Sequence, residues 1–203
     1  STRVRSSAAS DVYKRQEVVP LPKSITPAKE APFILSTSTH IGYPEGNEKL
    51  RQTAVFLSGY IREMTGIETE VTADTGSSNS IRLVLDRTAV SSPEGYRLKV
   101  GKRDITITGS SEAGIFYGIQ TLRKSLPVTG QKEISFPAVQ ILDEPEYRYR
   151  GMHLDVGRHF FSTDFIKKYI DIIALHNLNT FHWHLTDDQG WRCLLYTSPS
   201  PRD

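Results

Sequence analysis

A strand, a helix and a second strand follow one another directly near the C-terminal end of the sequence, and this order permits few folds. In residues 151–156 apolar side chains alternate with polar ones, and residues 178–185 have strand character. Between them, Ser162 can cap a helix that continues to His176. Strands joined by one crossover helix pair in parallel, so this segment is predicted to form a βαβ unit.

The residues before this unit follow a different pattern. Apolar residues recur every three or four positions in 49–64, with Gly66 directly behind as a stop signal. A second such stripe follows Ser111, a possible N-cap, and ends before Pro127. Strand-like segments separated by turn residues are 33–39, 68–73, 81–86, 96–100 and 105–108. Residues 17–142 are therefore predicted to form an α+β domain with two helices and a mostly antiparallel sheet.

A segment with Pro137, Pro145 and the acidic pair Asp143-Glu144 is interpreted as a linker to the second unit, which begins near Tyr147. A complete (β/α)₈ barrel takes about 250 residues, and the whole sequence has 203. If the βαβ unit at residues 147–192 belongs to a (β/α)₈ TIM barrel, it is therefore only the first unit of a truncated one.

The two ends of the sequence differ from the rest. Residues 1–16 (STRVRSSAASDVYKRQ) are polar and without periodicity, and residues 193–203 (CLLYTSPSPRD) do not continue the preceding segment. We interpret the first as disordered and both as non-native tails that resemble translated sequencing adapters. The alternative is a natural flexible tail.

Composition excludes several classes of partner and site. The formal net charge is +2 and no run of eighteen apolar residues occurs, so neither a nucleic acid nor a membrane is expected as a partner. Cys193 is the only cysteine, which excludes an intramolecular disulfide and a cysteine-based metal site. Partners have to be inferred from candidate sites instead.

Five of the six histidines and both tryptophans lie between His153 and Trp191, so a functional site is expected there. In a (β/α)₈ barrel the active face lies at the carboxyl ends of the strands. Arg158 follows the first predicted strand and Asp187 the second. Both side chains are therefore expected to face a substrate pocket.

Two motifs at this point, RGMHLDVGRHFF at 150–161 and LNTFHWHLTDDQGWR at 178–192, resemble the first two barrel strands of glycoside hydrolase family 20. Residues 17–142 also resemble the non-catalytic α+β domain of that family. The resemblance implies a fragment of an exo-β-N-acetylhexosaminidase. Such an enzyme removes terminal β-linked N-acetylglucosamine or N-acetylgalactosamine from glycans or oligosaccharides by a retaining, substrate-assisted mechanism. It needs no cofactor or metal, and the parent enzyme is expected to be periplasmic or secreted.

The resemblance also implies roles for single residues. Arg158 matches the arginine that binds the hydroxyls at carbons 3 and 4 of the terminal sugar, for which a guanidinium is well suited. Asp187 matches an aspartate in the polar network of the sugar site, where it can pair with Arg158. His184, close to the end of its strand, is the third substrate-binding candidate, whereas His182 is expected to be an interior histidine.

Other residues near the motifs have structural explanations. Arg150 precedes the first strand and is expected to stabilise the barrel. Asp155 is expected to have a structural role, accepting hydrogen bonds from the backbone or from Arg158. Trp191 could stack on a sugar or only pack within the protein. His182 and His184 share one face of their strand, but the sequence leaves open whether that face points to the barrel interior.

The family's catalytic Asp-Glu pair comes on a later barrel strand and has no counterpart before Arg192, so no catalytic residue is assigned and the chain itself is expected to be inactive. Two alternatives remain. His182-x-His184 with a nearby Asp could belong to a metal-dependent amidohydrolase. Alternatively, residues 17–142 could form a non-catalytic carbohydrate-binding module.

Overall fold

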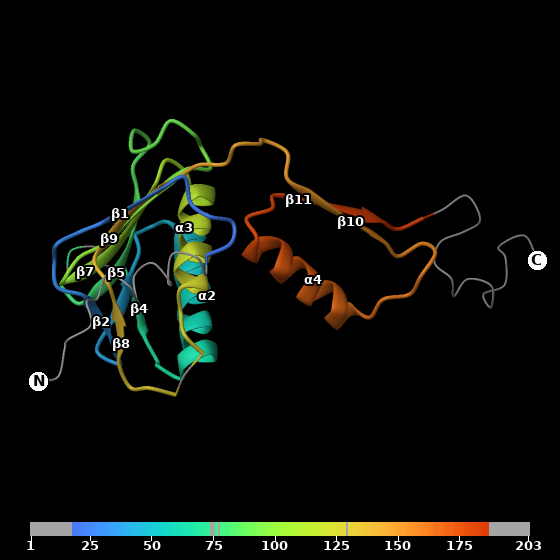
Figure 1. The fold of residues 1–203 in the computed structure, drawn as a ribbon. Helices are drawn as coiled ribbons and strands as arrows, with labels where there is room; N and C mark the ends of the chain where they lie inside the picture. Colours follow the sequence, from blue (N-terminus) through green and yellow to red (C-terminus); the bar gives the residue numbers. More distant parts are fainter. Residues whose placement is uncertain (1–17, 74–75, 77, 129, 187–203) are drawn as a thin grey trace, which may run out of the picture. The chain divides into compact units, whose positions relative to one another are not determined.

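The computed structural model describes residues 18–73, 76, 78–128 and 130–186. The chain divides into two compact units, Ser1–Glu146 and Tyr147–Asp203, called unit 1 and unit 2 below (Figure 1). The tails interpreted as non-native, 1–16 and 193–203, lie outside the described residues. No described helix has both the length and the apolar character that crossing a membrane requires.

Unit 1 contains a seven-stranded mixed sheet with the order β1-β9-β6-β7-β5-β3-β4. Its strands are β1 Ser24–Pro27, β3 His40–Gly42, β4 Glu70–Thr72, β5 Ser80–Leu85, β6 Tyr96–Val100, β7 Asp104–Gly109 and β9 Val139–Asp143. A separate antiparallel pair is formed by β2 Phe33–Leu35 and β8 Ile134–Phe136. The helices of unit 1, α2 Glu48–Thr65 and α3 Glu112–Lys124, lie on one face of the sheet (Figure 1).

The prediction of a mostly antiparallel sheet is wrong. The β1–β9, β9–β6 and β6–β7 ladders are antiparallel, but β7–β5, β5–β3 and β3–β4 are parallel. The cause is visible at β3 and β4, because α2 connects them and a crossover helix returns the chain in the same direction. The two helices themselves are confirmed.

Helix α2 exceeds the predicted 49–64 by one residue at each end, and α3 begins after the predicted cap Ser111 but ends at Lys124, earlier than the predicted end before Pro127. Asn47 caps α2 by accepting a hydrogen bond from the Leu50 N–H at 3.0 Å, and Gly66 ends the helix with a φ of 77°. Ser111 caps α3 by accepting from two backbone N–H groups. The predicted apolar stripes are buried against the sheet, apart from a partly buried methionine in α2. Periodicity and caps are local signals, which explains why the sequence was sufficient here.

Two predictions for unit 1 are corrected. The strand predicted at 33–39 ends at Leu35, because a turn closed by the Thr39 N–H on the Ser36 carbonyl follows it. The segment interpreted as a linker contains β9, which pairs with both β1 and β6 inside the sheet. Its alternating apolar and polar residues pack like those of any sheet strand, and the flanking prolines obscured this pattern.

Close backbone packing positions α3. A Cβ atom at Gly114 would lie 2.2 Å from the carbonyl oxygen of Gly95, which no side chain tolerates. Gly114 is in the first turn of α3, so the helix start contacts the backbone that leads into β6. The residue at this position therefore has to be glycine for the helix to pack as it does.

Unit 2 has the predicted βαβ order: β10 Gly151–Asp155, α4 Thr163–Leu175 and β11 Thr180–His184. The two strands pair in parallel, and Ser162 caps α4 by accepting from the Phe165 N–H at 3.2 Å. The parallel pairing and the cap are confirmed. One βαβ unit is consistent with the start of a (β/α)₈ barrel, although two strands do not by themselves define one.

Candidate functional site

The two strands of unit 2 sort their side chains onto two faces. In the parallel register His153 pairs with His182 and Asp155 with His184, so these four side chains share one face. The residues between them, Met152, Leu154, Phe181 and Trp183, occupy the other face. The histidines and the aspartate therefore lie on one face of the two-stranded sheet, and the apolar side chains lie on the other.

Helix α4 covers the face that carries Phe181 and Trp183. The ring centroids of Tyr169 and Phe181 are 5.7 Å apart, and those of Phe181 and Trp183 are 5.9 Å apart in a stacked arrangement. The Tyr169 hydroxyl also donates to the carbonyl oxygen of His153 at 3.1 Å. Because α4 lies on this side, the histidines lie on the face turned away from it. In a (β/α)₈ barrel, whose helices lie outside, the face turned away from the helix would be the interior one.

The three histidine rings on that face are in contact. His153 meets His182 edge-on, with ring centroids 4.8 Å apart, and its ring centroid lies 5.8 Å from that of His184. Each ring therefore restricts the orientation of the next. His184 is the residue of this group that lies at the carboxyl end of its strand.

Asp155 connects His184 to Arg158. Its Oδ1 atom accepts from the backbone N–H of Gly157 at 3.0 Å and of Arg158 at 3.1 Å, and lies 3.3 Å from Nδ1 of His184. Its Oδ2 atom lies 3.5 Å from the Arg158 guanidinium. The hydrogen bond from the Arg158 N–H is the main cause that lowers the pKa of the Asp155 carboxyl, assisted by the Gly157 N–H and by the charge of Arg158. Asp155 is thus held as a carboxylate.

The predicted site residues have different outcomes. Arg158 and His184 are brought together through Asp155, and the Arg158 side chain is 70% exposed. Asp187 and Trp191 lie outside the described residues, so their roles stay predictions. Asp155 accepts from the backbone and from Arg158, as predicted, but its contact with His184 was missed. The available signal was positional, since both residues are the last of their strands and adjacent strands align there.

Arg150 binds at the opposite end of β10. Its Nε donates to the carbonyl of Asn177 at 2.8 Å, and Nη1 donates to the carbonyl of Tyr147 at 2.7 Å. Its backbone N–H donates to the Asn179 side chain at 3.1 Å. These bonds join the start of β10 to the turn before β11. The prediction that Arg150 has a structural role is confirmed.

The amidohydrolase alternative gains no support from the geometry. In the part of the chain that the structure describes, no group of three or more histidine, cysteine or acidic side chains is arranged to hold a metal ion. His184 is instead paired with Asp155, and His182 packs against His153.

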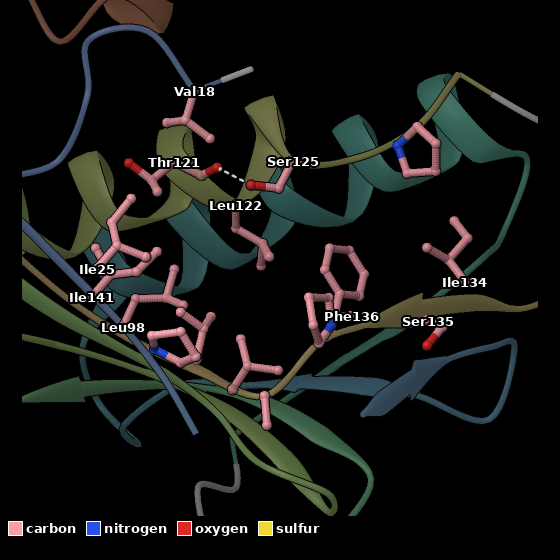
Figure 2. Close-up of a pocket in the computed structure, with 16 residues that line it drawn as sticks. Val18, Ile25, Leu98, Thr121, Leu122, Ser125, Ile134, Ser135, Phe136 and Ile141 are labelled. Carbon is pink, nitrogen blue, oxygen red and sulfur yellow. Dashed lines mark hydrogen bonds between the residues drawn. The ribbon is translucent and has the colours of Figure 1, made fainter. Parts of the chain in front are cut away.

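Unit 1 contains an apolar cavity of about 180 Å³ between α3 and the sheet (Figure 2). Sugar sites combine an aromatic platform with several polar groups. Here the lining is mostly aliphatic, Phe136 is the only aromatic residue in it, and polar side chains are limited to Thr121, Ser125 and Ser135. Figure 2 shows the Ser125 hydroxyl bonded within α3, where it donates to the Thr121 carbonyl. This cavity does not favour the carbohydrate-binding module.

The sequence has one Asp-Glu dipeptide, Asp143-Glu144, and its carboxylates hold unit 1 together. Asp143 accepts from the Tyr96 hydroxyl and from the Lys23 backbone N–H, both at 3.1 Å. Glu144 forms an ion pair with the Lys23 ammonium. The pair therefore has a structural role at the end of β9.

Known proteins match both units. Residues 15–144 match "Glycosyl hydrolase family 20, domain 2", and residues 147–201 match "Glycosyl hydrolase family 20, catalytic domain". A β-hexosaminidase of Porphyromonas gingivalis is 38% identical over 199 residues, which cover 95% of this chain and 25% of the relative. A β-N-acetylhexosaminidase of Cellulomonas fimi is 34% identical over 183 residues, or 90% of this chain and 37% of the relative.

Solved structures agree. The Streptomyces plicatus N-acetyl-β-hexosaminidase in complex with Thio-NAglucal is 38% identical with a TM-score of 0.78, and the match covers 87% of this chain and 36% of that one. A mutant of the same enzyme, in complex with the product GlcNAc, matches equally well. The chain thus spans well under half the length of these relatives. Both family models describe glycoside hydrolases, and the matched solved structures belong to the same class of protein. The chain belongs to glycosyl hydrolase family 20.

Proposed function

We propose that the chain is part of an exo-β-N-acetylhexosaminidase that removes terminal β-linked N-acetylglucosamine or N-acetylgalactosamine from glycans and oligosaccharides. The observation that carries this proposal is the joined pair of Arg158 and His184 at the carboxyl ends of β10 and β11. Further support comes from the relatives, which are named as hexosaminidases and come from several bacteria.

In this proposal Arg158 binds hydroxyls of the terminal sugar, and His184 completes the same subsite. A guanidinium presents several N–H donors in one plane and can bind two adjacent hydroxyls at once. The exposed Arg158 side chain is available to a ligand, while Asp155 fixes its base. Asp187 is proposed to take part in the same polar network.

The reaction itself is proposed to be retaining and substrate-assisted, with the acetamido oxygen of the sugar as the nucleophile. An Asp that orients the acetamido group and a Glu that protonates the leaving oxygen are then required. The only Asp-Glu dipeptide of these 203 residues, Asp143-Glu144, is engaged in unit 1. We therefore expect the 203-residue chain alone to be inactive and a chain with a complete catalytic domain to be active.

Hydrolysis of a nitrophenyl N-acetylglucosaminide tests the proposal. The 203-residue chain should release no nitrophenol above a buffer blank, and the chain extended through a full catalytic domain should release it. In the extended enzyme Arg158→Ala should lower kcat/KM about ten- to a hundredfold, since charge-assisted hydrogen bonds contribute roughly 1.5–3 kcal/mol. The exposed Arg148, at the other end of β10, is the matched control. An extended enzyme without activity, or an equal loss in Arg148→Ala, would contradict the proposal.

A further inference from the structure

The Asp155 carboxylate contacts both described residues that are proposed to bind the sugar. It is the last residue of β10, and His184, the last residue of β11, is its partner in the parallel register. One oxygen lies 3.3 Å from the His184 ring nitrogen Nδ1, and the other lies 3.5 Å from the Arg158 guanidinium. A single side chain is therefore in a position to set the geometry of both.

The 3.3 Å distance between Asp155 and His184 Nδ1 indicates where the imidazole carries its proton. An ionised carboxylate has no proton to donate, so a ring nitrogen that hydrogen-bonds to it has to be the N–H donor. In the neutral ring the proton then resides on Nδ1, and the lone pair is on Nε2. His184 thereby presents a hydrogen-bond acceptor beyond the carboxylate, which is the reverse of the tautomer that a free imidazole prefers.

The contact with Arg158 places a donor beside the same carboxylate. Oδ1 of Asp155 accepts the backbone N–H groups of Gly157 and Arg158 and so closes a tight turn directly after the strand. The guanidinium lies beside Oδ2 of the same carboxylate. Backbone and side chain of Arg158 are thus both held by Asp155, while most of the side chain stays accessible to a ligand.

We propose that Asp155 is a positioning residue that holds Arg158 as a donor and His184 as an Nε2 acceptor for the hydroxyl groups of the bound sugar. This inference rests on the proposed function. A sugar hydroxyl both accepts and donates a hydrogen bond, so a fixed donor next to a fixed acceptor suits it better than two donors. Asp155 acts through its two partners and does not itself contact the sugar.

A purely structural explanation is that Asp155 only closes the turn at 155–158. That role requires a side-chain oxygen as acceptor, which asparagine retains, whereas selecting the His184 tautomer requires the negative charge. Asp155→Asn therefore separates the two explanations. Asp164→Asn is the matched control, because Asp164 is an exposed acidic residue in the first turn of α4 and makes the same change of charge in unit 2.

The test is ¹⁵N NMR of the histidine rings in the 203-residue chain, at a pH well above the usual imidazole range. Loss of a signal in His184→Gln assigns the His184 ring. We expect the wild type and Asp164→Asn to show His184 protonated mainly on Nδ1, and Asp155→Asn to shift it to mainly Nε2. A wild-type ring protonated on Nε2, or averaged like a free imidazole, would overturn the inference, as would an Asp155→Asn spectrum equal to the wild type.

This measurement involves no sugar and no catalysis. If the tautomer is as expected but the extended enzyme does not hydrolyse the nitrophenyl substrate, the proposed function fails and the coupling through Asp155 stands. If the extended enzyme is active but His184 is protonated on Nε2, the function stands and the positioning role fails.

Discussion

Replacing Lys124 by methionine should raise the free energy of unfolding of unit 1. Lys124 is the last residue of α3, and its Nζ atom is shielded from solvent without a hydrogen-bond partner in the described part of the chain. Burial lowers the pKa of the Lys124 ammonium from its ordinary 10.5 to about 8, although Asp143 opposes this shift. The folded protein therefore holds a charge at an unfavourable place at neutral pH.

The size of the effect follows from this shift. A pKa lowered from 10.5 to about 8 corresponds to ~3.4 kcal/mol at 1.36 kcal/mol per pKa unit. The side chain is only partly buried, so solvent screening reduces this to roughly half. A cation in the last turn of a helix stabilises by about 0.3–1 kcal/mol, which the substitution forfeits. The net gain of Lys124→Met should be about 1 kcal/mol.

The pH dependence gives the stricter test. Between about pH 8 and 10.5 the unfolded chain binds more protons at Lys124 than the folded chain, so wild-type stability rises with pH there. The advantage of Lys124→Met should thus be complete below about pH 8 and vanish near pH 10.5. Urea unfolding followed by circular dichroism measures it, with Lys49→Met on the exposed side of α2 as control. Equal stability of variant and wild type at neutral pH, or a gain that is the same at high pH, would refute the reasoning.

Three further substitutions test a close backbone contact, a tyrosine hydrogen bond and a helix cap. Gly114→Ala should destabilise unit 1 by about 1–3 kcal/mol in urea unfolding, since its methyl group would overlap the Gly95 carbonyl; an unchanged midpoint would contradict the contact. Tyr96→Phe should cost about 1–2 kcal/mol in the same assay, because it removes the buried hydrogen bond with Thr121 and the part-buried one to Asp143. Ser162→Ala should cost about 1 kcal/mol through loss of the α4 cap, visible as faster amide exchange at the start of that helix.

Local signals made the helices predictable, whereas pairing partners were not. The start of α3 at Ser111 and the end of α2 at Gly66 depend on residues within one turn of the cap. By contrast, the parallel pairing of β3 with β5 joins segments that are far apart in the sequence, and no residue within either strand indicates this partner. Three-residue strands such as β3 also contain too little periodicity to be recognised. The predicted strand directions in the sheet were therefore wrong, although most of the longer strands were located correctly.

The candidate site shows the same division. Alternation along β11 predicted correctly that His182 and His184 share a face, but only the contact of Tyr169 with Phe181 shows which face α4 covers. Likewise, the sequence predicted that Asp155 accepts from Arg158, while its contact with His184 depends on the register between β10 and β11. Residue spacing within one strand is readable from sequence, and alignment between strands is not.

The pairing of β1 with β9 also determines when unit 1 can finish folding. Ser24 pairs with Leu142, so β1 is synthesised more than a hundred residues before the strand with which it pairs. Until β9 has left the ribosome, β1 has nothing to pair with and the outer edge of β6 is open. A ribosome that stalls before Val139 would then hold a nascent chain with unpaired strand edges, the kind of surface on which chaperone binding and aggregation compete.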